Sequence, residues 1–254
     1  MFEAQTEWIS PESFPDLKDH KYIAIDLETR DPGLKSRGSG ALIGDGDIVG
    51  IAVAVEGWSG YYSFGHKEGN FFDEAVVMRW IKEVCALPNV KLFHNAMYDV
   101  CWLRAYGVKI NGHIVDTMVM ASLVDENRLF YSLNSLSIDY LGQVKDETAL
   151  RAAADKAGID AKSEMWKLPA MYVGSYAEKD AELTLALFKT RRLLILNPSL
   201  DRGYNILGSI SAANQNYSDA VTNFNRALQI QPIVQIYLNT FEELFQKEIR
   251  LSLI

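Results

Sequence analysis

Apolar runs with the pattern of β-strands dominate the early part of the chain. Residues 22–29 (YIAIDLET) begin as a short apolar run that is fit to be a buried strand, and residues 48–56 (IVGIAVAVE) and 60–64 (GYYSF) are two further β-like runs. A short link at residues 56–59 separates the last two runs and indicates a hairpin. Residues 31–46, rich in Gly and Ser, are expected to form a loop.

Helical periodicity begins at about residue 72 and then alternates with short strands. Apolar residues within 72–87 form one stripe, and Asp73 and Glu74 lie near its start, as expected at a helix N-terminus. The remaining predicted elements are a strand at 90–94, a helix at about 96–106, a brief strand at 113–115, a helix to about 124, two helices within 132–159 and a helix at about 175–196. Asp116 is expected to cap one of these helices as a structural residue. Strands first, and then alternating strand and helix, predict an α/β fold with a mixed β-sheet flanked by helices.

The composition is that of a soluble globular protein, since 48% of the 254 residues are hydrophobic and 23% are charged. This length holds one sizeable domain, or one domain with a small appendage. The longest apolar runs are far shorter than a membrane span, and the N-terminus lacks the features of a signal peptide, so we expect no membrane partner. Cys85 and Cys101 have no metal-ligand spacing and are expected to be free thiols in a reducing compartment.

The formal net charge is -8, which argues against a generic basic nucleic-acid-binding protein. It does not exclude an enzyme that acts on nucleic acid, because bound divalent ions offset carboxylates locally. The net charge therefore leaves the class of partner open.

Two carboxylates follow the first apolar run. Asp26 and Glu28 occupy alternate positions of the predicted strand, so their side chains point to the same face. Burying two unpaired anions there is expensive, and a hard cation such as Mg²⁺ or Mn²⁺ would compensate their charge. The alternative is a strand that runs out into a solvated acidic turn, and the pair by itself does not decide between the two.

Further candidate residues lie at the starts of two predicted helices. Asp99 lies one turn into the helix that follows the strand at 90–94, and Asn95, four residues earlier, lies near the N-cap on the same side. Tyr176 and Asp180 share one face of the last predicted helix, at positions i and i+4. Taken singly, such residues are more often helix-front acids, solvated acids or core aromatics. Taken as an ordered set with the first pair, they favour a functional site.

Three motifs in order resemble the 3′→5′ exonuclease superfamily whose metal ligands are Asp, Glu, Asp and Asp, with a Tyr in the last motif. They are Asp26-x-Glu28, Asn95-x-x-x-Asp99 and Tyr176-x-x-x-Asp180. The surrounding segments are similar to the proofreading domain of bacteriophage-type DNA polymerase I-like (family A) polymerases. These segments are IAIDLET, FHNAMYDVCWL, VDTMVMASLVDENR, YSLNSL and SEMWKLPAMYVGSYAEKDAELT. The resemblance implies a ribonuclease H-like fold, and we expect the exonuclease domain at residues 21–196, after an entry segment at 1–20.

The resemblance also implies a two-metal mechanism. Two divalent ions, Mg²⁺ or Mn²⁺, about 3.5–4 Å apart would clamp the attacking and leaving oxygens of the scissile phosphodiester. By motif, the ligands of one ion would be Asp26, Glu28 and Asp180. Asp26 and Asp99 would hold the second ion, so Asp26 would bridge the two.

The remaining residues of the motifs are implied to handle water and substrate. Tyr176 would orient the attacking water, because a phenol with a pKa of about 10 is a poor general base. Leu27, Thr29 and Asn95 would contact the terminal nucleotide of a single-stranded or frayed DNA 3′ end, from which 5′-monophosphates are released. The resemblance implies a polymerase domain or subunit as a partner, and the cytoplasm of a bacterial cell or phage-infected host as the location.

A different pattern follows the exonuclease-like stretch. Residues 197–232 resemble one tetratricopeptide repeat and are expected to form a helical hairpin, followed by a C-terminal helix at 233–254. The matching positions are Tyr204, Leu207, Gly208, Tyr217, Ala220, Phe224, Ala227 and Pro232. One such repeat cannot bury its own apolar face, so it would pack on the exonuclease, pair with another copy or be marginal. A protein partner that binds through the repeat is a further expectation, and the sequence leaves a natural, inserted or engineered origin open.

Two alternatives to a DNA exonuclease follow from the sequence. An RNA-trimming exonuclease of the ribonuclease D type shares the four acids and the Tyr, although the polymerase-like segments favour DNA. A non-catalytic interaction module, in which the repeat binds a partner and the nuclease domain is a scaffold, belongs to a different class. Metal-dependent stabilisation and digestion of labelled oligonucleotides distinguish these alternatives.

Overall fold

The computed structural model describes residues 6–124 and 126–196, together with residues 218, 221–222 and 225. The predicted hairpin at 197–232, apart from those four residues, and the predicted helix at 233–254 lie outside the described residues. The α/β fold belongs to a structural unit that ends at Phe188.

The described residues form one five-stranded sheet. Its strands are β1 (Tyr22–Arg30), β2 (Asp47–Val55), β3 (Trp58–Ser63), β4 (Val90–Phe93) and β5 (Ile114–Asp116). The strand order is β3-β2-β1-β4-β5. Strand β2 is antiparallel to both of its neighbours, β1 and β3, whereas β4 is parallel to β1 and β5 is parallel to β4. This arrangement confirms the predicted mixed sheet of the ribonuclease H-like type, and it places β1 at the centre.

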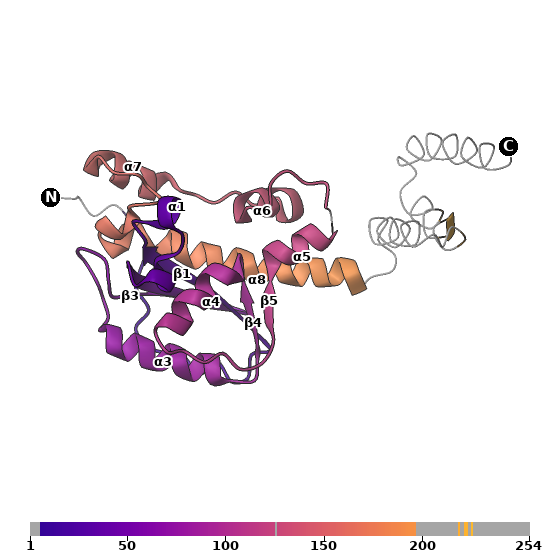
Figure 1. Ribbon diagram of the computed structural model, residues 1–254, viewed down its shortest axis with the longest axis horizontal. Helices are drawn as coiled ribbons and strands as arrows, with labels where there is room; N and C mark the ends of the chain where they lie inside the picture. The colour runs from indigo at the N-terminus through magenta and orange to yellow at the C-terminus, as the bar shows by residue number, and fades with distance from the viewer. Residues whose placement is uncertain (1–5, 125, 197–217, 219–220, 223–224, 226–254) are drawn as a thin grey trace. The chain divides into compact units, whose positions relative to one another are not determined.

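Helices connect the strands and flank the sheet, as predicted. They are α1 (Leu34–Arg37), α2 (Gly40–Ile43), α3 (Glu74–Ala86), α4 (Ala96–Ala105), α5 (Thr117–Val124), α6 (Leu133–Leu141), α7 (Thr148–Ala157) and α8 (Gly174–Leu196), with 3₁₀ turns at Met165–Lys167 and Ala170–Tyr172. In Figure 1, α3 lies along one side of the domain and α6 and α7 lie along the opposite side. None of the described helices combines the length and apolar character needed to span a membrane.

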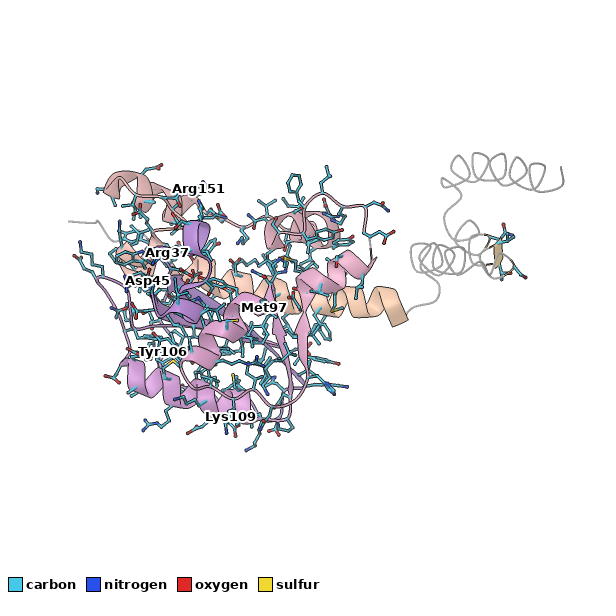
Figure 2. The ribbon with its side chains drawn as sticks, viewed as in Figure 1. Arg37, Asp45, Met97, Tyr106, Lys109 and Arg151 are labelled. Atoms are coloured by element: carbon cyan, nitrogen blue, oxygen red, sulfur yellow. The ribbon has the colours of Figure 1, made fainter. Side chains whose placement is uncertain are left out.

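The Gly/Ser-rich connection between β1 and β2 differs from the expected loop, because it contains the short helices α1 and α2. Arg37 at the end of α1 forms an ion pair with Asp45, which follows α2 (Figure 2). Both oxygens of Asp31 accept the backbone N–H of Gly40, at 3.2 and 3.1 Å. Polar contacts within residues 31–46, and not a periodic pattern of hydrophobic residues, therefore stabilise this segment.

Alternation along β1 divides the core into two layers. Ile23, Ile25 and Leu27 belong to the apolar cluster that includes the buried faces of α3 and α4. Ala24, on the opposite face, belongs to the cluster that includes α7 and α8. Both faces of β1 are thus covered, and each large apolar side chain buried there contributes about 1.5–3 kcal/mol. Side chains at positions 26 and 28 share the face of Ala24 and point toward α8.

Gly50→Ala should destabilise the sheet next to the acids. Gly50 pairs with Glu28 of β1, and a Cβ at position 50 would lie 2.1 Å from the hydroxyl oxygen of Tyr61. That hydroxyl lies 2.5 Å from Nε2 of His66, so the Tyr61 ring cannot move without breaking a buried hydrogen bond. We expect urea unfolding to show a loss of about 1–3 kcal/mol. Wild-type stability of the variant would show that the ring moves aside at no cost.

Candidate active site at the end of the central strand

The two acids of β1 lie where the strand leaves its regular pairing. Asp26 and Glu28 share the face turned toward α8, as their spacing predicts, and Glu28 is only 7% exposed. A β-bulge follows at once, because Glu28 pairs with Gly50 whereas Thr29 pairs with Ile48. Bulges of this kind end regular pairing and re-aim side chains next to active sites.

Helix α4 brings a third acid to the same place. It begins at Ala96, shortly after β4, and Asp99 lies in its first turn. Asp99 is 4% exposed, and its Oδ1 accepts the backbone N–H of Leu27 at 3.2 Å. Because Leu27 lies between Asp26 and Glu28, this hydrogen bond fixes the third carboxylate beside the first two.

Asn95 occupies the N-cap position of α4, as predicted, but its side chain makes no capping hydrogen bond. Its backbone is left-handed, with a φ of 69°, a conformation that Asn tolerates better than most residues. Asp116 instead accepts the backbone N–H groups of Asn95 and Ala96 at 3.1 and 2.8 Å, and that of Met118 at 2.8 Å. Asp116 therefore caps α4 and α5 together, as a structural residue, and the side chain of Asn95 stays exposed.

The fourth acid and the Tyr lie one turn apart on α8. Tyr176 is 8% exposed and Asp180 is 7% exposed. Glu178, on the same helix, accepts the backbone N–H of Tyr61 at 2.9 Å. This hydrogen bond ties α8 to strand β3 at the edge of the sheet, and so holds the site residues of the helix over β1.

Burial raises the pKa of each of the four acids. For Glu28, burial and then repulsion from Asp180 raise the pKa to about 8. The pKa of Asp99 also rises to about 8, because burial outweighs the hydrogen bond from Leu27. Burial, and then repulsion from the other three acids, raises the pKa of Asp26 well above its usual range. Four carboxylates thus share a place where water solvates them poorly and where positive charge is strongly favoured.

A lysine that sequence reasoning missed supplies positive charge. Lys145, from the segment between α6 and α7, has its Nζ 2.5 Å from Oδ1 of Asp180. The side chain is 5% exposed, and Nζ lies 4.2 Å from the centre of the Tyr176 ring. Lys162 also approaches this ring, at 5.7 Å, but forms an ion pair with Glu147 at 2.9 Å. No local signal marks Lys145, because the segment that carries it has neither helical nor strand periodicity.

A cleft of about 290 Å³ opens at these side chains. Its walls include Asp26, both site residues of α8 and both lysines. His94 also reaches the wall, where its ring nitrogens are hydrogen-bonded to the Thr117 hydroxyl at 2.9 Å and the Tyr131 carbonyl at 3.0 Å. Burial lowers the pKa of His94 to about 4, so it is a neutral structural group with both ring nitrogens hydrogen-bonded.

The three predicted nucleotide contacts are placed differently from one another. Asn95 is exposed at the start of α4, and Thr29 is half-buried after the bulge. The Thr29 hydroxyl lies 2.6 Å from the hydroxyl of Tyr98, which donates to Asp31 at 3.2 Å and was not assigned from the sequence. Leu27 is 6% exposed and packs in the core layer of α3 and α4, on the face opposite to the acids. Leu27 thus supports the site through its backbone N–H.

The four carboxylates are the kind of ligand that binds a hard divalent cation, although their side chains are not arranged around a metal position. In the part of the chain that the structure describes, no three His, Cys, Asp or Glu side chains lie as a metal-binding group. Carboxylate oxygens are nonetheless the ligands that Mg²⁺ and Mn²⁺ prefer, and a cation would relieve the repulsion among the acids. The contact that such a cation would replace is the ion pair of Asp180 with Lys145.

A mixed sheet with acids from β1, α4 and α8 gathered at the end of its central strand, beside a cleft lined by Asp26 and Asp180, defines an α/β enzyme of the ribonuclease H-like class. The family model described as 3′-5′ exonuclease matches residues 4–194. The chain belongs to this exonuclease family, as its motifs predict. A second family model, SHNi-TPR, matches residues 204–232, in agreement with the repeat expected there.

Curated relatives are polymerases of phages and bacteria. The DNA-directed DNA polymerase of Pseudomonas phage M6 is 32% identical over 208 residues, which are 79% of this chain and 31% of the phage protein. DNA polymerase I of Pseudomonas aeruginosa is 27% identical over 179 residues, which are 67% of this chain and 18% of that protein. The chain therefore spans less than a third of the length of these relatives.

Solved structures that resemble the chain are less similar in sequence. The catalytic core of RRP6 from Trypanosoma brucei is 19% identical with a TM-score of 0.49, over 84% of this chain and 47% of that one. NrnC of Brucella melitensis with bound Mg²⁺ is 12% identical with a TM-score of 0.47, over 84% of this chain and 87% of that one.

Without divalent ions, the acidic cluster should make the protein less stable as the pH rises. The pKa values of Glu28 and Asp99 are raised to about 8 in the folded chain. Both carboxyl groups therefore keep protons in the folded state that they release at about pH 4 in the unfolded state. The free energy of unfolding therefore falls as the pH rises between about 4 and 8, by at most about 1.4 kcal/mol per pH unit for each group. In EDTA, we expect the melting temperature to fall from about pH 6.5 to about pH 8.

Asp99→Asn is the matched control for this measurement, because it removes one titrating group from the cluster. Its melting temperature should fall less steeply over the same range. Burial lowers the pKa values of His66 and His94 to about 4, so both are neutral in the folded state over this range. In the unfolded state they release protons at about pH 6.5, which opposes the fall in stability only at the low end of the range and is outweighed by the two acids. A wild-type melting temperature that rises across the range would contradict the expectation.

Proposed function

We propose that the domain removes nucleotides from the 3′ ends of single-stranded or frayed DNA and releases 5′-monophosphates. The observation that carries the proposal is the convergence of four acids from β1, α4 and α8, in a chain of the 3′-5′ exonuclease family. Phosphodiester hydrolysis develops negative charge on the oxygens around phosphorus, and an active site must stabilise that charge.

The acids would hold two divalent ions, Mg²⁺ or Mn²⁺. We assign Asp26, Glu28 and Asp180 to one ion, and Asp26 and Asp99 to the other. The chemistry supplied by the bound ions is activation of the attacking water and stabilisation of the departing 3′-oxygen. The backbone N–H of Leu27 keeps Asp99 in position for this task through its 3.2 Å hydrogen bond.

Tyr176 is suited to orient the attacking water. Burial, and then the charges of the neighbouring carboxylates, raise the pKa of its hydroxyl above the usual range. A phenol that keeps its proton acts through hydrogen bonds and not as a general base. Asp180, through a hydrogen bond, and Lys145, against the ring face, hold the side chain in one orientation.

The terminal nucleotide would meet Thr29 and Asn95, whose side chains are accessible from solvent. Tyr98 adds a hydroxyl beside Thr29. Leu27 stays a prediction as an apolar contact, since its side chain lies in the core layer. The cleft volume of about 290 Å³ is at the low end for small-ligand pockets. Such a cleft suits the end of one strand, so a duplex end would have to fray before cleavage.

DNA is the proposed substrate because the curated relatives are named as DNA polymerases. The same relatives support a polymerase domain or subunit as a partner, in a bacterial cytoplasm or a phage-infected host. The repeat matched at residues 204–232 supports a protein partner for that segment. We propose that residues 1–20, 21–196, 197–232 and 233–254 are the entry segment, the exonuclease domain, the repeat and a terminal helix.

Wild-type protein should digest 5′-labelled single-stranded DNA to a ladder in Mg²⁺ and leave it intact in EDTA. Asp26→Ala removes the acid shared by the two proposed ions and should lower the rate by about 100- to 1,000-fold or more. Asp47→Ala is the matched control and should keep the wild-type rate, because Asp47 is an exposed acid of β2 that pairs with Arg30. Equal digestion by wild-type and Asp26→Ala proteins would refute the assignment.

DNA and RNA oligonucleotides of the same base sequence separate the proposed activity from RNA trimming. We expect the DNA strand to be digested faster, in line with the polymerase relatives. Faster digestion of the RNA strand, with the same loss in Asp26→Ala, would favour an enzyme of the ribonuclease D type.

Binding of Mn²⁺ should also be measurable as stabilisation. A ligand that binds only the folded state raises the free energy of unfolding in proportion to the logarithm of its concentration over its Kd. The melting temperature of the wild type should therefore rise with Mn²⁺, and the rise should vanish in the Asp26→Ala/Asp180→Ala double variant. A wild-type melting temperature that does not respond to Mn²⁺ would favour the non-catalytic interaction module.

A further inference from the structure

Lys145 is a buried cation of the acidic cluster, and its contact with the Tyr176 ring does not account for its ion pair with Asp180. Building on the metal-dependent activity proposed above, we propose that Lys145 competes with divalent ions for Asp180 and thereby sets the metal affinity of the site. The ammonium lies against Oδ1 of Asp180, a carboxylate that would also hold a metal ion. Lys145 is thus a positioning residue that holds Asp180 until a divalent ion takes its place.

The first support is the burial of the charge. An ammonium group that is removed from water is costly unless it is paired, and the Lys145 side chain is only 5% exposed. Two contacts compensate this cost: the ion pair with Asp180 at 2.5 Å, and the face of the Tyr176 ring at 4.2 Å. Both partners lie on α8 and both belong to the proposed site, so the lysine is built into it.

The second support is the arrangement of the acids. Four carboxylates converge, yet in the described residues no three of the His, Cys, Asp or Glu side chains form a metal-binding group. The oxygen of Asp180 is turned to the ammonium of Lys145. Because like charges repel, a divalent ion bound to Asp180 and this ammonium would weaken each other's contact with the carboxylate. We therefore expect binding of the ion to displace Lys145.

The third support is the place of Lys145 in the chain. It lies outside β1, α4 and α8, in the segment that follows the end of α6 at Gly142, where φ is +63°. The acids are fixed by the sheet and its flanking helices, whereas Lys145 reaches them on a long side chain from a connecting segment. Withdrawal then needs rotation of one side chain and leaves the carboxylate framework in place.

Lys162 provides an internal comparison. It reaches the same cleft and the same ring of Tyr176, at 5.7 Å, but pairs with Glu147 at 2.9 Å and is 49% exposed. Lys162 therefore contributes positive charge near the site without occupying an oxygen of Asp180. A difference between substitutions at the two positions reports on direct competition and not on net charge alone.

The test measures Mn²⁺ binding by the electron paramagnetic resonance signal of free Mn²⁺, with full-length wild type, Lys145→Met, Lys145→Arg and Lys162→Met. Lys145→Met keeps the length of the side chain and removes its charge, so we expect its Kd for Mn²⁺ to fall by about tenfold or more. Lys145→Arg retains a competing cation and should bind Mn²⁺ much as the wild type does. Lys162→Met should change the Kd by less than Lys145→Met.

Thermal unfolding supplies the second readout. In EDTA, Lys145→Met should melt below the wild type, because the cluster has lost its cation; in excess Mn²⁺ the difference should shrink or reverse. A purely structural lysine would lower the melting temperature equally in both conditions and would leave the Kd unchanged or raise it. That result would overturn the proposal. If Lys145→Met does not fold, Lys145→Gln replaces it, with the same expected fall in Kd.

The two proposals fail in different ways. Absence of Mn²⁺ binding and of DNA digestion in the wild type would overturn the proposed function and, with it, the role of Lys145. Mn²⁺ binding by the wild type with an unchanged or weaker affinity in the Lys145 variant would overturn the role of Lys145 alone.

Discussion

The gathering of four carboxylates at one place, three of them buried and Asp26 half-buried at the cleft, is the constraint on which this structure depends. Each acid comes from a rigid element, and each costs free energy to bury as an anion. The fold offsets part of that cost with polar contacts to individual acids. Asp99 is held by a backbone N–H of β1, and Asp180 is held by an ion pair with Lys145.

The sheet makes this convergence possible because β1 lies at its centre. An antiparallel neighbour on one side and a parallel neighbour on the other leave the end of β1 flanked by the start of α4. Helix α8 crosses the other face and is tied to the edge strand β3 through Glu178 and Glu182, which bond Tyr61 and Ser59 at 2.9 and 2.7 Å. Glu178 and Glu182, which have no proposed catalytic role, thus help to position Asp180 on the same helix.

The charge balance of the cluster links folding to the proposed activity. If the site held only acids, repulsion among the carboxylates would destabilise the fold or raise their pKa values until they took up protons. If a cation stayed bound to the acids permanently, it would compete with any metal ion. A lysine on a connecting segment satisfies both requirements, because its charge is present when needed and its side chain can move. The central strand, in contrast, is covered by apolar layers on both faces.

The sequence by itself determined the mixed α/β fold, the pairing of Asp26 with Glu28 on one strand face, and the placing of Asp99, Tyr176 and Asp180 on helices. These follow from local periodicity, which is 2 in a strand and 3.6 in a helix, so they can be read from neighbouring positions. The family model matches residues 4–194, the stretch that carries those motifs.

Only the tertiary structure decided which groups complete the site. Lys145 meets Asp180 across 35 residues of chain, and the backbone N–H of Leu27 meets Asp99 across 72. The two short helices between β1 and β2 likewise depend on polar contacts such as Arg37 with Asp45. Contacts between distant segments leave no period in the sequence, because each partner satisfies its own local pattern equally well without the other.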